Sequence, residues 1–92
     1  MKYSVKPSST FRKDLKRAEK RGYNLALLTE VIKLLANRDD LPLKYRDHCL
    51  SGDYNSCREC HITPDWLLIY ELTESDLILY LMRTGTHSDL FV

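Results

Sequence analysis

Long hydrophobic runs are absent from this chain of 92 residues, and glycine and proline are scarce. The longest uninterrupted apolar run extends from Leu77 to Met82, far short of the ~20 residues that a membrane-spanning helix needs. Lys2 and Lys6 occupy the stretch where a secretory signal would place its apolar segment, so we expect no export signal. No repeat, linker or low-complexity tract interrupts the sequence. We therefore expect one domain over residues 1–92, a cytoplasmic location and no membrane partner.

Cysteine is also rare, and its odd number argues against a disulfide framework. We expect reduced thiols and interpret Cys49, Cys57 and Cys60 as small, partly buried hydrophobic residues. The C-x-x-C-H spacing of covalent haem attachment ends at His61, but residues i and i+3 of a strand point to opposite faces. With His48 the same side chains offer zinc ligand types, yet a structural zinc site wants two close pairs and only one C-x-x-C exists. Haem and zinc are therefore the weaker alternatives.

Charge is unevenly distributed, although the formal net charge is only +1. Residues 1–24 carry eight basic and two acidic side chains, whereas the rest of the chain carries six basic and eleven acidic ones. A cationic segment on a nearly neutral protein attracts a polyanion or an acidic partner. The alternative is an ordinary solvated helix face.

Hydrophobic periodicity predicts an α+β fold. Residues 2–6 alternate between polar and apolar side chains, which predicts a short strand. A first helix follows, with Ser8, Ser9 or Thr10 as its N-terminal cap and Gly22 at its C-terminal end. A second helix begins at Asn24, and the two helices form an antiparallel hairpin that lies on a sheet. The later strands are expected over residues 54–62, 66–72 and 77–83. Helices first and an antiparallel meander afterwards indicate the α+β class.

The expected hairpin between the last two strands places polar residues at one end of the sheet. A four-residue turn over residues 73–76 pairs Leu72 with Leu77 and therefore sets Trp66 opposite Arg83. Asp65, His61, His87 and Phe91 should then lie at the same end of the sheet. Whether His61 shares a face with Arg83 stays open, because a slip of one residue turns every side chain to the other face.

Three histidines in the second half of the chain, each beside a turn, point to proton-transfer chemistry. His48, His61 and His87 can each act as acid or base, because an imidazole with its unperturbed pKa of ~6.5 populates both forms near neutral pH. Cleavage of RNA needs a base for the ribose 2′-hydroxyl, an acid for the leaving 5′-oxygen and positive charge for the phosphate. Arg83 offers a bidentate fork for phosphate oxygens, and Asp65 can orient an imidazole or take a proton.

Four further residues are candidates for binding RNA. Phe91 and Trp66 could stack on a base, and Lys44 and Arg46 could touch the backbone. Each has a simpler interpretation, since a lone tryptophan is more often core and loop cations are more often solvated. The hypothesis depends on convergence of these residues in space.

The chain resembles the YafQ branch of the RelE-type toxins, within the RelE/ParE superfamily, and the likeness covers essentially its whole length. Two signatures carry the resemblance together, H-x-x-P-D-W at residues 61–66 and R-T-G-T-H-x-x-L-F at residues 83–91. The remaining matching segments are Leu43–His48, Leu50–Gly52, Arg58–Ile62 and Pro64–Tyr70.

The resemblance implies a messenger-RNA endoribonuclease of a type II toxin–antitoxin pair, which cuts messages in the ribosomal A site without metal or other cofactor and so inhibits translation. It implies a microbial-RNase-like fold, in which an N-terminal strand and a two-helix hairpin pack on an antiparallel sheet and a short helix or tail ends the chain. By the family's pattern His87 and Asp65 are the proton-transfer pair, His48 and His61 assist, and Arg83 binds the phosphate. Which group is the base and which the acid stays open.

The resemblance also implies two partners. One is a DinJ-like antitoxin of the ribbon–helix–helix type, whose disordered segment folds over the toxin to give a heterotetramer. The other is ribosomal RNA, a dense polyanion. Contact with the ribosome would then use the basic residues of the first helix, namely Lys13, Lys16, Arg17, Lys20 and Arg21. The alternative function, from another class, is a catalytically silent module that binds RNA or a partner through this same helix.

Overall fold

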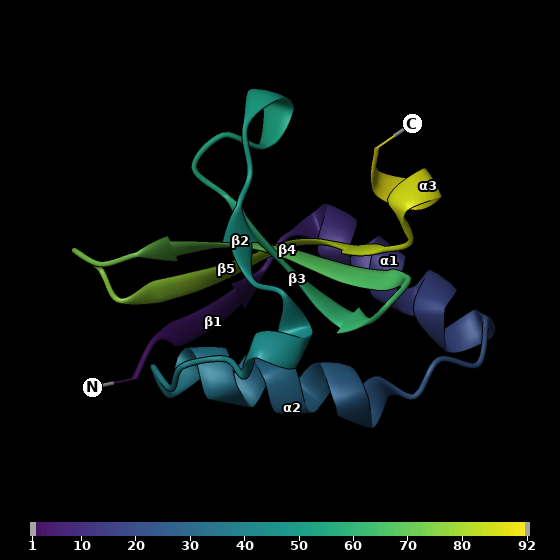
Figure 1. Ribbon diagram of the computed structural model, residues 1–92, viewed down its shortest axis with the longest axis horizontal. Coiled ribbons are helices and arrows are strands. Elements are labelled where there is room, and N and C mark those ends of the chain that lie inside the picture. Colours follow the sequence, from purple (N-terminus) through teal and green to yellow (C-terminus); the bar gives the residue numbers. More distant parts are fainter. Residues whose placement is uncertain (1, 92) are drawn as a thin grey trace.

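A five-stranded sheet in the order β1-β5-β4-β3-β2 forms the centre of the molecule, which a computed structural model describes for residues 2–91 (Figure 1). Neighbouring strands are antiparallel except β1 and β5, which run parallel. The strands are β1 (Ser4–Pro7), β2 (His48–Cys49), β3 (Arg58–Thr63), β4 (Trp66–Thr73) and β5 (Ile78–Gly85). The helices are α1 (Ser9–Lys20), α2 (Leu25–Ala36) and α3 (His87–Leu90), with 3-10 turns η1 (Leu43–Tyr45) and η2 (Gly52–Tyr54).

This architecture confirms the α+β class and the C-terminal helix, but the sheet is mixed and not wholly antiparallel. The first strand pairs with the last one along the chain, Ser4 opposite Ile78 and Pro7 opposite Leu81. Strand β2 was not expected, and β3 begins at Arg58 because η2 occupies the start of the segment predicted as strand. No helix within residues 2–91 is long and apolar enough to cross a bilayer.

Both long helices begin and end where their capping residues predict. The Ser8 side chain accepts a hydrogen bond from the Phe11 amide at 2.9 Å, and Asn24 Oδ1 accepts one from the Ala26 amide at 3.1 Å. Each bond satisfies one of the amides that a helix N-terminus leaves without an intrahelical partner. Gly22, with φ of 77°, follows the end of α1 in the left-handed conformation that glycine adopts without a Cβ penalty.

The core has two parts, one on each face of the sheet. The larger part joins α1 and α2 to one face, and Figure 1 shows α2 along that face with α3 on the other side. The smaller part lies under α3 and comprises Cys57, Leu67, Ile69 and Leu90. Strand β4 is buried on both faces from Trp66 to Tyr70, which explains why its sequence is continuously apolar and does not alternate.

The β4–β5 register differs from the predicted one. Leu72 lies opposite Leu79 and Leu67 lies opposite Gly85, so the pairing of Trp66 with Arg83 was wrong. Two local features cause the difference. The four-residue turn comprises residues 74–77, one position later than expected, and a shift between Ile69 and Tyr70 leaves one extra residue, at position 82, in β5.

Candidate functional site

A row of side chains crosses four strands on the face that lies away from α2. His48 lies opposite Glu59, Glu59 lies opposite Ile69, and Ile69 lies opposite Arg83. Residues opposite one another on neighbouring strands project to the same face. His61 is two residues after Glu59 on β3 and therefore projects to this face as well. The irregularity in β5 thus answers the open question: His61 and Arg83 share a face.

The three histidines form a continuous line of rings. The ring centroids of His48 and His61 are 6.3 Å apart, and those of His61 and His87 are 6.2 Å apart. Phe91 extends the line, with its centroid 5.5 Å from that of His87, and Tyr54 packs edge-on against Phe91 at 5.6 Å. The expected convergence of the histidines with Phe91 is therefore present, although they come from β2, β3 and the α3 region.

Glu59 forms the floor beneath two of these rings. Its side chain is 4% exposed, and Oε1 lies 3.4 Å from His48 Nε2 and 3.5 Å from His61 Nε2. The other ring nitrogen of each histidine faces a backbone carbonyl, since His48 Nδ1 is 2.8 Å from the oxygen of Arg46 and His61 Nδ1 is 3.4 Å from that of Pro64. Oxygens on both sides suit a doubly protonated imidazole, because only that form donates from both nitrogens. The pair can therefore present positive charge above a buried carboxylate.

His48 is held in place by the residue before it. The Asp47 carboxylate accepts from Arg58 Nη2 at 3.0 Å and from the hydroxyl of Tyr70. Burial first, and then the hydrogen bond to Asp47, raises the pKa of Tyr70 well above its usual range, so this hydroxyl stays a donor. The loop that leads into β2 is thus tied to β3 and β4.

His87 is positioned by α3. Thr86 caps this helix, accepting from the Asp89 amide at 3.2 Å while Asp89 Oδ2 accepts from the Thr86 amide at 2.9 Å. Leu90 anchors the helix in the smaller core. The imidazole of His87 is exposed, and no hydrogen bond or ion pair with another residue of 2–91 engages it. Its nitrogens are therefore open to a substrate.

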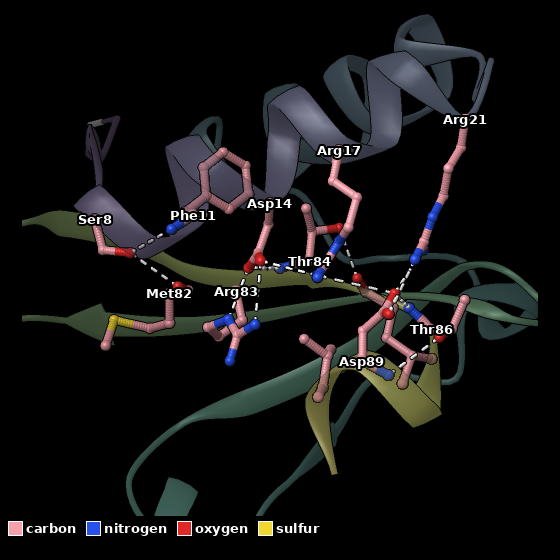
Figure 2. A network of polar contacts seen from close by, with 12 residues as sticks. Ser8, Phe11, Asp14, Arg17, Arg21, Met82, Arg83, Thr84, Thr86 and Asp89 are labelled. Carbon is pink, nitrogen blue, oxygen red and sulfur yellow. Dashed lines mark hydrogen bonds and ion pairs between the residues drawn. The ribbon is translucent and has the colours of Figure 1, made fainter. Parts of the chain in front are cut away.

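Arg83 is bound by a residue that the sequence did not single out. The carboxylate of Asp14, 5% exposed, accepts from Arg83 Nε at 2.7 Å and Nη2 at 3.1 Å, from Arg17 Nη2 at 3.0 Å and from the Thr84 amide at 3.2 Å (Figure 2). Because β1 pairs with β5 only as far as Leu81, the edge of β5 beyond that point is open, and Asp14 takes the place of a strand partner there.

Asp14 above all, with a smaller contribution from Tyr54, raises the pKa of Arg83. The Arg83 side chain is 24% exposed, and its hydrogen bonds to Asp14 use Nε and Nη2.

Lys44 and Arg46 lie beside His61. They line a hollow of about 400 Å³ beside His61, together with Leu27, Tyr45, Ile62, Thr63 and Pro64. Lys44 Nζ lies 5.1 Å from the ring centre of Tyr45. The hollow therefore combines two cations and an apolar wall next to the histidine line.

Trp66 and Asp65 lie elsewhere. Trp66 is 3% exposed, packs against the ring of Tyr23 at 4.9 Å and donates from Nε1 to Thr84 Oγ1 at 2.8 Å, so it is a core residue with no open face for a base. Asp65 is exposed on the β3–β4 turn and borders a separate hollow of about 290 Å³ with Tyr23 and Asn24. Within the described chain no hydrogen bond or ion pair connects Asp65 with a histidine or with Arg83. The structure thus brings together the three histidines and Phe91, with Arg83 on the same face of the sheet but bound to Asp14, whereas Asp65 is not connected with them.

The basic residues of α1 fall into two groups. Arg17 contacts Asp14, and Arg21 forms two hydrogen bonds to Asp89, so both guanidinium groups make ion pairs with other residues of the same chain. The lysines of the predicted ribosome surface are exposed and form no ion pair with another described residue: Lys13, Lys16 and Lys20.

The cysteines are only partly as expected. Cys57 and Cys60 are buried in opposite parts of the core, and burial raises the pKa of both thiols, that of Cys60 to about 12. Their opposite directions prevent them from meeting at one haem or one tetrahedral metal ion. Cys49 is exposed, with its Sγ 2.9 Å from Arg58 Nη1, so its interpretation as a partly buried residue was wrong.

Sequence reasoning missed Glu59, Asp14 and Tyr54. Strand periodicity could have found Glu59, because it precedes His61 by two residues and shares its face. Asp14 gave a weaker signal, as the acidic residue between Phe11 and Ala18 on the buried side of a basic helix. Nothing in the sequence indicated that Tyr54 would contact Phe91.

Comparisons with known proteins show to which family the chain is similar. Residues 3–92 match the family model described as the bacterial toxin of type II toxin–antitoxin systems, YafQ. The mRNA interferase toxin YafQ of Escherichia coli (strain K12) is 42% identical over 88 residues, covering 95% of this chain and 94% of the relative. The toxin in the crystal structure of the E. coli DinJ–YafQ toxin–antitoxin complex superposes with a TM-score of 0.90 at 40% identity, over 100% of both chains. A metal-bound toxin from Helicobacter pylori gives 0.91 at 43% identity, over 99% and 100% of the two chains.

Proposed function

The chain belongs to the YafQ family of toxins from bacterial type II toxin–antitoxin systems, and from this membership we propose that it is a messenger-RNA endoribonuclease. Its relative in E. coli is named an mRNA interferase toxin. The observation that carries the proposal is the line of His48, His61 and His87 above the buried carboxylate of Glu59.

The proposed reaction is transfer of the phosphate to the neighbouring ribose oxygen. The 2′-oxygen attacks phosphorus while a base removes its proton, and the bond to the 5′-oxygen breaks while an acid protonates that leaving oxygen. His87 exchanges a proton with the substrate, since its nitrogens have no partner among residues 2–91. His48 and His61 supply positive charge above Glu59, and the guanidinium group of Arg83 adds a further positive charge for the phosphate oxygens.

The flanking RNA would lie along the same face. Phe91 is 41% exposed next to His87 and offers a ring on which a base can stack. On the other side of His61, Lys44 and Arg46 border the hollow that can take a neighbouring nucleotide and its phosphate. We assign no substrate role to the buried Trp66.

We propose that this chemistry needs no metal ion. Two protonated imidazoles and an arginine provide the positive charge that a metal would otherwise supply, and they do so beside the group that transfers the proton. The similar toxin from H. pylori was solved with a metal bound. A transition metal that bound the imidazoles of this chain would compete with their protons. Added metal should therefore inhibit and not activate.

The partners follow from the family and from charge. We propose that cleavage occurs on translating ribosomes in the A site, with the exposed lysines of α1 on ribosomal RNA. An antitoxin of the kind present in the DinJ–YafQ complex would neutralise the toxin in a heterotetramer, and the location would be cytoplasmic.

The decisive experiment is primer extension on messenger RNA from translating ribosomes, with the wild-type protein and His87→Ala. We expect cleavage by the wild type to persist when transition metals are chelated while the Mg²⁺ that ribosomes require is kept constant, and to fall by a factor of about 10² to 10⁴ in the variant, because one proton-transfer group is lost. Wild-type cleavage by His87→Ala, or a requirement for an added transition metal, would contradict the assignment. Asp65→Asn in the same assay tests the partnership of Asp65 with His87, which stays a prediction from the resemblance.

The silent binding module is the competing function, and the basic surface of α1 favours it. Such a module would associate with ribosomes in a salt-sensitive manner and leave every message intact. Absence of cleavage by the wild-type protein under saturating association would therefore select this alternative.

A further inference from the structure

We propose that Arg21 and Asp89 form a clamp that positions His87 for catalysis, and this inference rests on the proposed nuclease function. Arg21 ends α1, whereas Asp89 belongs to α3, 68 positions later in the sequence. Neither residue touches the reacting atoms. Both are positioning residues, and they act through the short helix that begins at His87.

The clamp is a two-pronged contact. Arg21 Nη1 donates to Asp89 Oδ2 at 2.7 Å and Nη2 donates to Oδ1 at 3.1 Å, the fork geometry that fixes orientation as well as distance (Figure 2). Arg17 Nη2 lies 3.9 Å from the same carboxylate. Asp89 is only 13% exposed, so water screens this pair less than it would a fully exposed one.

Asp89 also caps α3, which connects the contact with Arg21 to the start of this helix. The same carboxylate accepts from the Thr86 amide at 2.9 Å and so closes the capping box at the start of α3. Arg21 first, and the Thr86 amide second, hold the pKa of Asp89 far below its usual range. A carboxyl with a depressed pKa stays ionised until the pH falls through that value, so the clamp persists across the whole range in which histidines titrate.

A helix of four residues needs such an anchor. One turn of helix is marginal by itself, because its nucleation cost exceeds what its few hydrogen bonds return. Besides the clamp, α3 is held by Leu90 in the smaller core and by a hydrogen bond of 3.4 Å from the Tyr54 hydroxyl to the Leu90 carbonyl. These contacts hold the last residue of α3, whereas Arg21 holds the Asp89 side chain, whose carboxylate reaches back to the Thr86 amide beside His87. Small displacements of a reacting group cost large factors in rate, so the clamp should be visible in kinetics.

The test compares variants from both sides of the contact in the ribosome cleavage assay. We expect Arg21→Ala and Asp89→Asn each to lower the cleavage rate at saturating ribosome by at least about tenfold, with little change in the ribosome concentration that gives half the maximal rate. Asn at position 89 keeps an oxygen for the Thr86 amide and removes only the charged fork. The double variant should be no slower than the worse single one, because both remove the same contact.

Charge provides the sharpest control. If Arg21 acted by attracting RNA, Asp89→Asn would strengthen ribosome association, since it removes a negative charge. The clamp instead predicts that Arg21→Ala and Asp89→Asn both lower the cleavage rate. Arg12→Ala removes an exposed arginine from the same helix and should leave the saturating rate unchanged. An Asp89→Asn variant as fast as the wild type, or an effect of Arg21→Ala confined to ribosome association, overturns the proposal.

A measurement without substrate separates the clamp from the nuclease function. In the NMR spectrum of the free protein, Arg21→Ala should shift the ring resonances of His87 and raise the amide exchange rate of Phe91, whose amide donates to the His87 carbonyl at 2.8 Å. The resonances of His48 should stay in place. A protein that cuts no RNA but shows these changes would refute the nuclease and leave the clamp standing. An active protein whose variants show neither change would refute the clamp alone.

Discussion

Two buried carboxylates, Asp14 and Glu59, differ in the kind of partner that compensates their charge. Asp14 accepts from two arginines and a backbone amide, which are donors at any pH that proteins meet. Within residues 2–91 the partners of the Glu59 carboxylate are the ring nitrogens of His48 and His61. An uncompensated buried charge is expensive, so Glu59 depends on these two side chains. Asp14 is therefore a structural contact between α1 and β5, whereas Glu59 belongs to the proposed reactive site.

Replacement of Glu59 by glutamine tests that distinction. Gln retains the size and one oxygen but removes the charge, so the two imidazoles lose the buried carboxylate that holds their rings in place. We expect Glu59→Gln to reduce the cleavage rate on ribosomes by about ten- to a hundredfold. The matched control is Glu71→Gln on β4, a half-buried carboxylate that accepts from Ser56 at 2.9 Å and contacts no histidine in the described structure. Equal rates for Glu59→Gln and the wild type would remove Glu59 from the site.

At the scale of elements, what the sequence predicted and what it missed have separate physical causes. The helix ends were predictable because caps act within a few residues, as Ser8, Asn24 and Gly22 show. Strand β4 was predictable because burial on both faces makes its sequence continuously apolar. The β4–β5 register was not, since the turn position and the irregularity in β5 depend on Leu77 taking a positive φ of 53° and on how the whole ladder packs.

The candidate site also has residues that the sequence predicted and residues that it did not. His48, His61, His87, Arg83 and Phe91 were identified from their residue chemistry and from motifs that resemble a family. Asp14 was not identified, because it comes from α1 and lies about seventy positions from Arg83 in the chain. Such a buried carboxylate acquires its role from the elements that close over it, whereas the periodicity of β3 could have pointed to Glu59.

The approach of β5 to α3 depends on Gly85. A Cβ at this position would lie 2.9 Å from Asp89 Oδ2 and 3.0 Å from Asp89 Cβ, distances that side chains do not tolerate. Gly85→Ala should therefore push Asp89 away, open the capping box and displace His87. We expect a fall in the saturating cleavage rate of at least about tenfold, measured together with the melting temperature.

Loss of stability alone must be separated from loss of position. Val31→Ala on α2 removes buried methyl groups at a site remote from α3 and should cost roughly 1–2 kcal/mol of stability. At a temperature where both variants are folded, Val31→Ala should cut RNA at the wild-type rate. If the two variants lose activity in proportion to their melting temperatures, Gly85 has no positional role.

For the molecule as a whole, charge and chemistry lie on different surfaces. The side chains of the proposed reactive site occupy the sheet face beneath α3, and α1 carries five of the eight basic side chains of residues 1–24. Since Arg17 and Arg21 form ion pairs with Asp14 and Asp89, the proposed contact with a polyanion would fall to the exposed lysines. Under the proposed function, affinity for the ribosome could then change without a change in the catalytic step.

Simultaneous reversal of Lys13, Lys16 and Lys20 to glutamate measures this separation. We expect ribosome association to weaken strongly and to lose salt dependence by about 0.7 to 0.9 in logarithmic slope for each phosphate contact removed, because fewer counterions are released. The cleavage rate at saturating ribosome should stay within about twofold of the wild type, since no residue of the histidine line has changed. The control reverses three exposed lysines outside this surface, Lys2, Lys6 and Lys33, and changes the net charge by the same amount. Equal weakening by both triple variants would show that only overall charge matters, whereas a selective effect of the α1 variant on association identifies this helix as the ribosome surface.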